Sequence, residues 1–191
     1  MPLSTMAAIM LLIALASGLL DRSLQNPHIG RFQVFAFIVL AALLRIATIS
    51  FSPEYEVNAG CVFTACVLFA AAAAADGKNC LKAVAAAAVC ALPAAALELI
   101  LDQDAAALLA ALVPLAAAPI LSSRPTLLLA SAMTPVFAAA FMMLFGLASD
   151  GYGTFELTGR MLDLQWLGIL FVSLLPELLS TIKSRRVKSE L

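Results

Sequence analysis

The chain has 191 residues, of which 63% are hydrophobic and 12% are charged, and its formal net charge is −1. The charged fraction is about half that of an ordinary soluble domain, so the composition predicts a multi-pass membrane protein built as one domain. The sequence offers no basic surface for nucleic acid, which excludes that class of partner.

Seven apolar runs predict helices close to the length that crosses roughly 30 Å of hydrocarbon at about 1.5 Å per residue. The expected fold class is therefore all-α, a bundle of seven transmembrane helices. The first run has no preceding Lys or Arg, so we interpret it as a retained helix rather than a signal peptide. In chain order the predicted spans are 2–20, 32–50, 57–75, 83–101, 105–121, 126–149 and 164–182. They form one transmembrane domain, 1–182, followed by a basic cytoplasmic tail, 183–191.

Polar segments separate these runs and carry turn-forming residues. A loop at 21–31 contains Asn26-Pro27 and Gly30, and the turn 76–79 reads Asp-Gly-Lys-Asn. The run 83–101 is expected to lie centrally, because alanines recur every fourth residue along it and let a neighbouring backbone come close.

The distribution of Lys and Arg predicts the orientation, because cytoplasmic loops are enriched in these residues. With the tail inside, seven spans place the N-terminus outside and leave only Arg160 on the outer side. Trp166, Tyr55 and Tyr152 then fall at or beyond the outer boundary, where amphipathic rings are favoured. The basic residues on the cytoplasmic side are Arg22, Arg31, Lys78, Lys82, Arg124, Lys183, Arg185, Arg186 and Lys188.

Three ionisable side chains lie within predicted spans, where charge is costly and is often functional. Arg45 and Glu98 are both predicted in the outer half of the membrane, where they can meet. Together they would form either a substrate or proton site or a structural ion pair. Alternatively, the Arg45 side chain extends outward to water. Glu177 follows Pro176, whose missing N–H exposes polar backbone, although the carboxylate can also contact the basic tail. The candidate substrate-binding residues are Arg45, Glu98, Asn58 and Glu177.

Proline occurs within each of the last four spans, a pattern that fits bent helices around a solute cavity as well as ordinary kinks. No metal site is predicted, because the four cysteines lack CxxC spacing and His28 is the only histidine. That single histidine also removes the usual serine and metal-dependent catalytic arrangements, so neither an enzyme nor a cofactor is expected.

The sequence favours a small permease, or the solute-binding membrane subunit of a transporter, with a polar site in the outer half of the bundle. The alternative is a noncatalytic scaffold or accessory subunit that binds other membrane proteins or anionic lipid headgroups. A third hypothesis is a membrane enzyme that acts through the acidic outer loops. The expected location is the cell membrane. The expected partners are the lipid bilayer, a small-molecule solute, and a membrane protein or a second copy of the chain.

Overall fold

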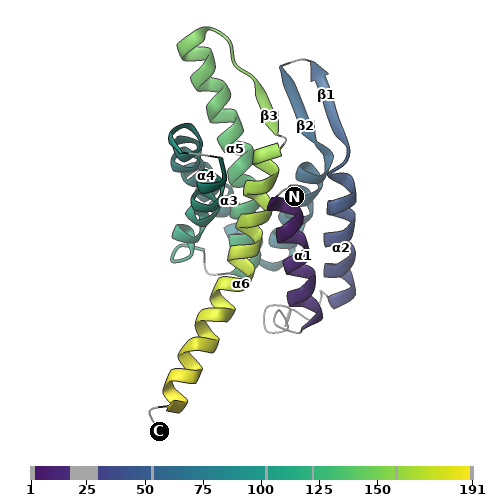
Figure 1. The fold of residues 1–191 in the computed structure, drawn as a ribbon, viewed down its shortest axis with the longest axis vertical. Helices are drawn as coiled ribbons and strands as arrows, with labels where there is room; N and C mark the ends of the chain where they lie inside the picture. Colours follow the sequence, from purple (N-terminus) through teal and green to yellow (C-terminus); the bar gives the residue numbers. More distant parts are fainter. Residues whose placement is uncertain are drawn as a thin grey trace.

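The computed structural model describes residues 3–17, 30–52, 54–101, 103–121, 123–157 and 159–189. These residues form a mostly helical protein with a small sheet at one end (Figure 1). Residues 18–29, which include His28 and most of the expected loop 21–31, and the last two residues lie outside the described ranges. The elements in chain order are α1 (Leu3–Ala16), α2 (Arg31–Leu44), β1 (Thr48–Ser52), β2 (Tyr55–Asn58), α3 (Ala59–Ile100), α4 (Gln103–Leu112), the 3₁₀ turn η1 (Val113–Ala117), α5 (Arg124–Asp150), β3 (Phe155–Leu157) and α6 (Gly159–Ser189).

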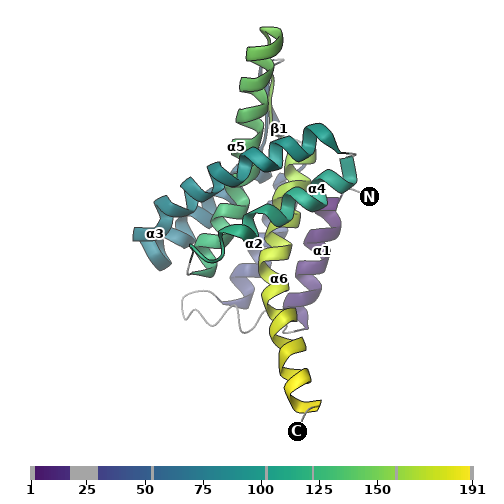
Figure 2. The ribbon, with the colours of Figure 1, turned by 90° about the vertical axis from the view of Figure 1, so that its left-hand side faces the viewer.

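The helices are arranged in two directions. Figure 2 shows α1, α5 and α6 standing roughly upright, while α3 and α4 lie obliquely across them. Contacts between α3 and α5 are the most extensive in the molecule, and α6 packs against α1, α4 and α5. The described part of α6 continues to Ser189 as one helix, through the boundary expected at residue 182.

The second predicted span ends early. Residues 45–50 were expected to complete a helix, but α2 stops at Leu44 and the chain enters strand β1. The physical reason is local: apolar and hydroxyl residues alternate through Thr48–Ser52, the pattern of a strand. β1 pairs antiparallel with β2, and β2 pairs in parallel with β3, giving the order β1-β2-β3.

The four-residue turn predicted at 76–79 is replaced by a break at a single residue inside α3. Asp76 has non-helical backbone angles (φ −157°, ψ 66°), so α3 consists of two helical segments, 59–75 and 77–100. The Asn79 side-chain amide donates to the Asp76 carboxylate at 2.8 Å, which stabilises this break. These segments correspond closely to the predicted spans 57–75 and 83–101.

The expectation of seven full spans is not supported. Within the described residues only Ala59–Ile100 and Arg124–Ser149 have both the length and the mean hydropathy of a membrane span, and α3 is broken as described above. The helices Leu3–Ala16 and Arg31–Leu44 have 14 residues each, or about 21 Å at 1.5 Å per residue. The run that contains α4 is short because Pro114 lacks an N–H and the helix tightens into η1.

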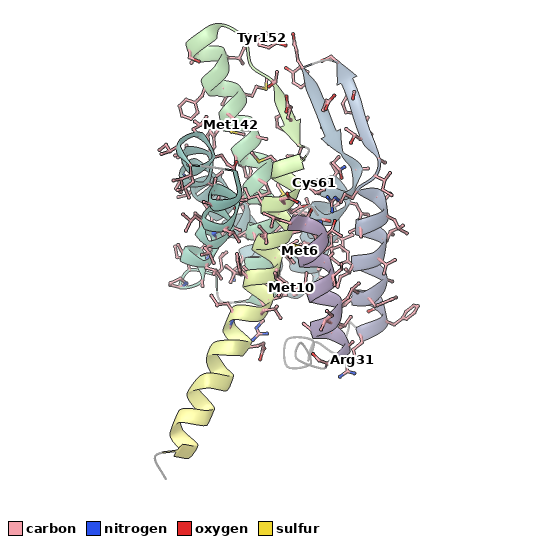
Figure 3. All side chains as sticks on the ribbon, viewed as in Figure 1. Met6, Met10, Arg31, Cys61, Met142 and Tyr152 are labelled. Carbon is pink, nitrogen blue, oxygen red and sulfur yellow. The ribbon has the colours of Figure 1, made fainter. Side chains whose placement is uncertain are left out.

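The buried and exposed side chains are distributed in an unusual way. The interior consists largely of alanines, with polar side chains such as Thr64, Thr134 and Gln165 among them. Large apolar side chains are buried along α6 between Met161 and Val172, but many others lie on the outside; Met6 and Met10 of α1, labelled in Figure 3, are about half exposed. Exposed large apolar side chains occur on α1, α2, α3, α4 and α5, so the apolar outer surface covers most of the bundle.

Candidate functional site

The end of α2 and the start of α3 are held together by one side chain, Asn58. Its Oδ1 accepts the backbone N–H groups of Gly60 (2.9 Å) and Cys61 (3.3 Å) and so caps α3. Its Nδ2 donates to the backbone carbonyl of Arg45 at 2.6 Å. Asn58, predicted to bind substrate, therefore has its amide engaged in positioning Arg45.

Gly60 permits the close approach of these two helices. A Cβ atom at Gly60 would lie 2.8 Å from the carbonyl oxygen of Ala41 and 2.8 Å from the backbone nitrogen of Arg45. No side chain fits in that space, so the α2 backbone rests directly on α3. The position of Arg45 is thus fixed by backbone contacts as well as by Asn58.

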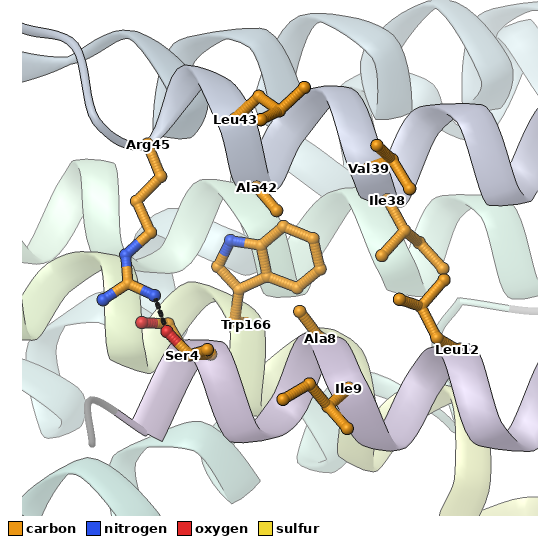
Figure 4. Close-up of a pocket in the computed structure, with 11 residues that line it drawn as sticks. Ser4, Ala8, Ile9, Leu12, Ile38, Val39, Ala42, Leu43, Arg45 and Trp166 are labelled. Atoms are coloured by element: carbon orange, nitrogen blue, oxygen red, sulfur yellow. Dashed lines mark hydrogen bonds between the residues drawn. The ribbon is translucent and has the colours of Figure 1, made fainter.

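A cavity of about 270 Å³ lies between α1 and α2, with Trp166 of α6 in its wall (Figure 4). We call it the α1–α2 slot. Its wall is apolar over most of its length, and the polar groups gather at one end. The lining residues are Ser4, Thr5, Ala8, Ile9, Leu12, Ile38, Val39, Ala42, Leu43, Arg45 and Trp166.

Hydrogen-bond donors define the polar end of the slot. The Arg45 guanidinium donates to the Thr5 hydroxyl. The Ser4 hydroxyl is buried and has no hydrogen-bond partner among the described residues. Figure 4 shows the Trp166 indole nitrogen on the side of the ring that faces Arg45. Arg45 is the one charged side chain in the slot lining, so the slot pairs a single positive charge with an apolar wall.

One carboxylate lies close behind this polar end. Asp163 of α6 accepts the backbone N–H of Ser4 at 2.7 Å, which ties the first turn of α1 to α6. Asp163 is not part of the slot lining. Its negative charge is placed at the N-terminal end of α1, where the helix dipole favours an anion.

Of the predicted pair Arg45 and Glu98, only Arg45 lines the slot. The Arg45 guanidinium reaches Thr5 on α1, whereas Glu98 is buried near the C-terminal end of α3. A site that includes both residues stays a prediction.

Glu177 forms an ion pair elsewhere in the molecule. Its Oε1 lies 2.6 Å from a guanidinium nitrogen of Arg124, the first residue of α5. The Glu177 side chain is 6% exposed and that of Arg124 is 41% exposed, so the pair lies at the edge of the interior. It joins α5 to the middle of α6 and takes no part in the slot.

Sequence reasoning missed the polar residue at the centre of the bundle, Gln165. Its Nε2 donates to the carbonyl of Cys61 on α3 at 3.2 Å and to that of Ala132 on α5 at 3.0 Å. One fully buried amide thus connects α3, α5 and α6. Its position inside the predicted span 164–182, beside a tryptophan, was the available signal.

Three slot residues were also missed. Trp166 was predicted at the outer boundary of the membrane without a role in a site; it is 1% exposed and lies in the slot wall. Ser4 and Thr5 form a hydroxyl pair at the start of the first apolar run, a signal that was present in the sequence.

Comparisons with protein-family models, with curated proteins and with solved structures found no match for this chain.

Proposed function

We propose that this chain is a multi-pass membrane protein that binds a small solute in the α1–α2 slot, as a small permease or as the solute-binding membrane subunit of a transporter. The observation that carries the proposal is Arg45, with the Ser4 and Thr5 hydroxyls, at one end of a cavity whose other lining residues are apolar or Trp166. Binding sites combine an apolar wall with a few polar groups that orient the ligand. The described slot residues form no nucleophile–base pair, so binding is favoured over catalysis.

A location in the membrane is supported by the distribution of side chains. Soluble monomers rarely expose a continuous apolar surface, whereas here large apolar side chains cover most helices. Small residues and hydrogen-bonded polar side chains dominate the interior, as expected where helices pack within lipid. The short helices α1 and α2 fit a proposal in which the bilayer thins locally or flanking residues complete the crossing.

The proposed orientation places the sheet outside and the end of α6 in the cytoplasm. Figure 3 shows Arg31 at the end of the bundle opposite Tyr152, in keeping with a basic inner side and an aromatic outer side. Glu54, Glu56 and Glu156 belong to the sheet end. In this orientation Arg45, at the outer end of α2, is close to the membrane–water boundary.

Thermal unfolding of the purified full chain in detergent tests solute binding. A ligand present at 100 times its Kd stabilises the folded state by about 2.7 kcal/mol, or roughly 5–11 °C for a chain of this size. We expect such shifts from small anionic solutes, and we expect Ala42→Leu to abolish them because Ala42 lines the slot.

Ala36→Leu is the matched control, because Ala36 is an exposed alanine on α2 outside the slot lining. It should leave the ligand-induced shift intact. A screen in which no solute shifts the unfolding temperature, or in which Ala42→Leu and Ala36→Leu behave alike, contradicts binding in the slot.

The alternative, a noncatalytic scaffold, is favoured by the surface of β1. Ile49 and Phe51 are exposed apolar residues on this edge strand, the kind of surface that pairs with another chain. Light scattering of the purified protein measures its mass in detergent. A stable complex that Phe51→Ser dissociates, together with a failed solute screen, would favour the scaffold over the solute-binding protein.

A further inference from the structure

We infer that the ligand of the α1–α2 slot is an amphiphile with an anionic head group and a single apolar chain, and that it enters from the bilayer. This inference rests on the proposed function and specifies its ligand class. The head group would be a carboxylate or a phosphate, since either accepts hydrogen bonds from the same donors.

The polar end of the slot selects an anion. The guanidinium of Arg45 presents several N–H groups in a planar fork, of which the structure shows one engaged with Thr5. The buried Ser4 hydroxyl, without a hydrogen-bond partner among the described residues, is a further donor at the same end. A cationic head group would face the guanidinium and find no charged acceptor in the slot lining.

The remainder of the slot fits a chain. The lining residues of α1 run from Ser4 to Leu12, a distance of about 12 Å along the helix axis at about 1.5 Å per residue. Ile38, Val39 and Leu12 lie towards the apolar end in Figure 4, away from Arg45. A volume of about 270 Å³ exceeds the roughly 150 Å³ of a cavity that holds benzene and is below most drug-sized sites. A narrow hydrocarbon tail suits these dimensions better than a bulky polar solute.

The rim of the slot indicates the route of entry. Ile9 on α1 and Leu43 on α2 both line the slot and are 42% and 59% exposed. These side chains continue the apolar outer surface of α1 and α2, which the bilayer covers in the proposed orientation. A lipid-like molecule can therefore move sideways into the slot while its head group stays near the boundary at Arg45.

Asp163 sets the limit on anion affinity. Its carboxylate is bonded to the backbone N–H of Ser4, so a negative charge lies just behind the donors. Removing that charge by Asp163→Asn should strengthen binding of an anionic head group. The same change should leave a cationic amphiphile unaffected or slightly weaker.

The chain carries its own reporter, because Trp166 is its only tryptophan and lines the slot. The full chain is placed in nanodiscs of unlabelled phosphatidylcholine and titrated with amphiphiles that carry bromine on one acyl chain. Bromine quenches tryptophan fluorescence on close approach, so occupancy of the slot is read directly. Three probes share the same chain and differ in head group: carboxylate, phosphate and trimethylammonium.

We expect the carboxylate or phosphate probe to quench Trp166 at a concentration at least about tenfold lower than the trimethylammonium probe does. Arg45→Gln should remove this difference, and Arg45→Lys should retain part of it because the charge remains. Equal quenching by all three probes in the unaltered protein overturns the anionic assignment. Quenching that is relieved by soluble acetate or inorganic phosphate alone overturns the requirement for a chain.

The slot-filling variant separates the two levels of the proposal. Ala42→Leu should prevent quenching by every probe, and Ala36→Leu should not. If quenching is insensitive to Ala42→Leu, the probes act from the bilayer, and the slot itself is refuted as a binding site. If Ala42→Leu prevents quenching while the head groups remain indistinguishable, the slot binds solutes and only the amphiphile class is refuted. Circular dichroism of each variant establishes that the helices are retained.

Discussion

The contact between α2 and α3 at Gly60 permits a sharp test of the site architecture. Gly60→Ala places a Cβ 2.8 Å from two backbone atoms of α2, and about 0.6 Å of separation is needed to reach an ordinary contact near 3.4 Å. Backbone atoms cannot rotate away as a side chain can. Overpacking of this kind costs about 1–3 kcal/mol, while alanine in a helix gains about 0.5–1 kcal/mol over glycine. The expected net loss is about 1–2 kcal/mol.

That loss corresponds to a fall of roughly 2–8 °C in the unfolding temperature for a chain of 150–250 residues. Gly77→Ala is the matched control, because it lies in the same helix and a Cβ there meets nothing within 4 Å. It should leave the stability unchanged or raise it. Both variants are measured by Trp166 fluorescence during heating in detergent.

The Arg45 backbone nitrogen is one of the atoms that the added Cβ would contact. Gly60→Ala should therefore also weaken the preference of the slot for an anionic head group. Equal unfolding temperatures for Gly60→Ala and Gly77→Ala would refute the close approach. A destabilised Gly60→Ala protein with an unaltered head-group preference would show that the contact supports the fold but not the position of Arg45.

Three further predictions concern the cap, the ion pair and the orientation. Asn58→Ala should cost about 1–2 kcal/mol by removing the α3 cap, and Asn58→Ser should cost less because its hydroxyl retains an acceptor for the first N–H groups of α3; equal unfolding midpoints for both would contradict the cap. Arg124→Gln should destabilise the protein more than Glu177→Gln, because it removes the cation from a buried carboxylate. A double-mutant cycle should give a coupling energy of about 1 kcal/mol between the two residues. Additive losses of stability would show that the ion pair contributes nothing. The orientation is tested in a variant from which the native cysteines have been removed. Ser50→Cys should react with an impermeant maleimide on intact cells, and Ser184→Cys should react only after permeabilisation. The reverse labelling pattern would show that the orientation is opposite to the one proposed.

The sequence predicted helices and breaks where the signal is strong and local. α3 breaks at Asp76, within the predicted polar turn, because a run of polar residues between alanine-rich segments has few alternatives. The helix prediction was wrong at 45–50, because mean hydropathy does not distinguish a helix from a strand. The alternation through Thr48–Ser52 and the following Pro53 were the informative features, and they were outweighed by the apolar content of the whole run.

For the site, the cost of a charge in an apolar segment drew attention to Arg45, which lines the slot, but the sequence did not indicate its neighbours. Residues brought together by packing are separated widely in sequence: Thr5 of α1 accepts a hydrogen bond from Arg45, and Trp166 of α6 lines the same slot. Nothing in the linear pattern states which face of α2 turns towards α1. Glu98 was paired with Arg45 on membrane depth alone, and depth does not fix the direction around a helix axis.

The slot is lined by α1 and α2 from the start of the chain and by Trp166 of α6, and this has a consequence for biosynthesis. Trp166 closes a cavity whose other walls come from α1 and α2, and β3 completes a sheet begun about 100 residues earlier. At 5–20 residues per second, a ribosome needs roughly 5–20 s to extend the nascent chain from the hairpin to β3. During that interval α1 and α2 lack the wall that Trp166 supplies, so the α1–α2 slot is among the last parts of the molecule to form.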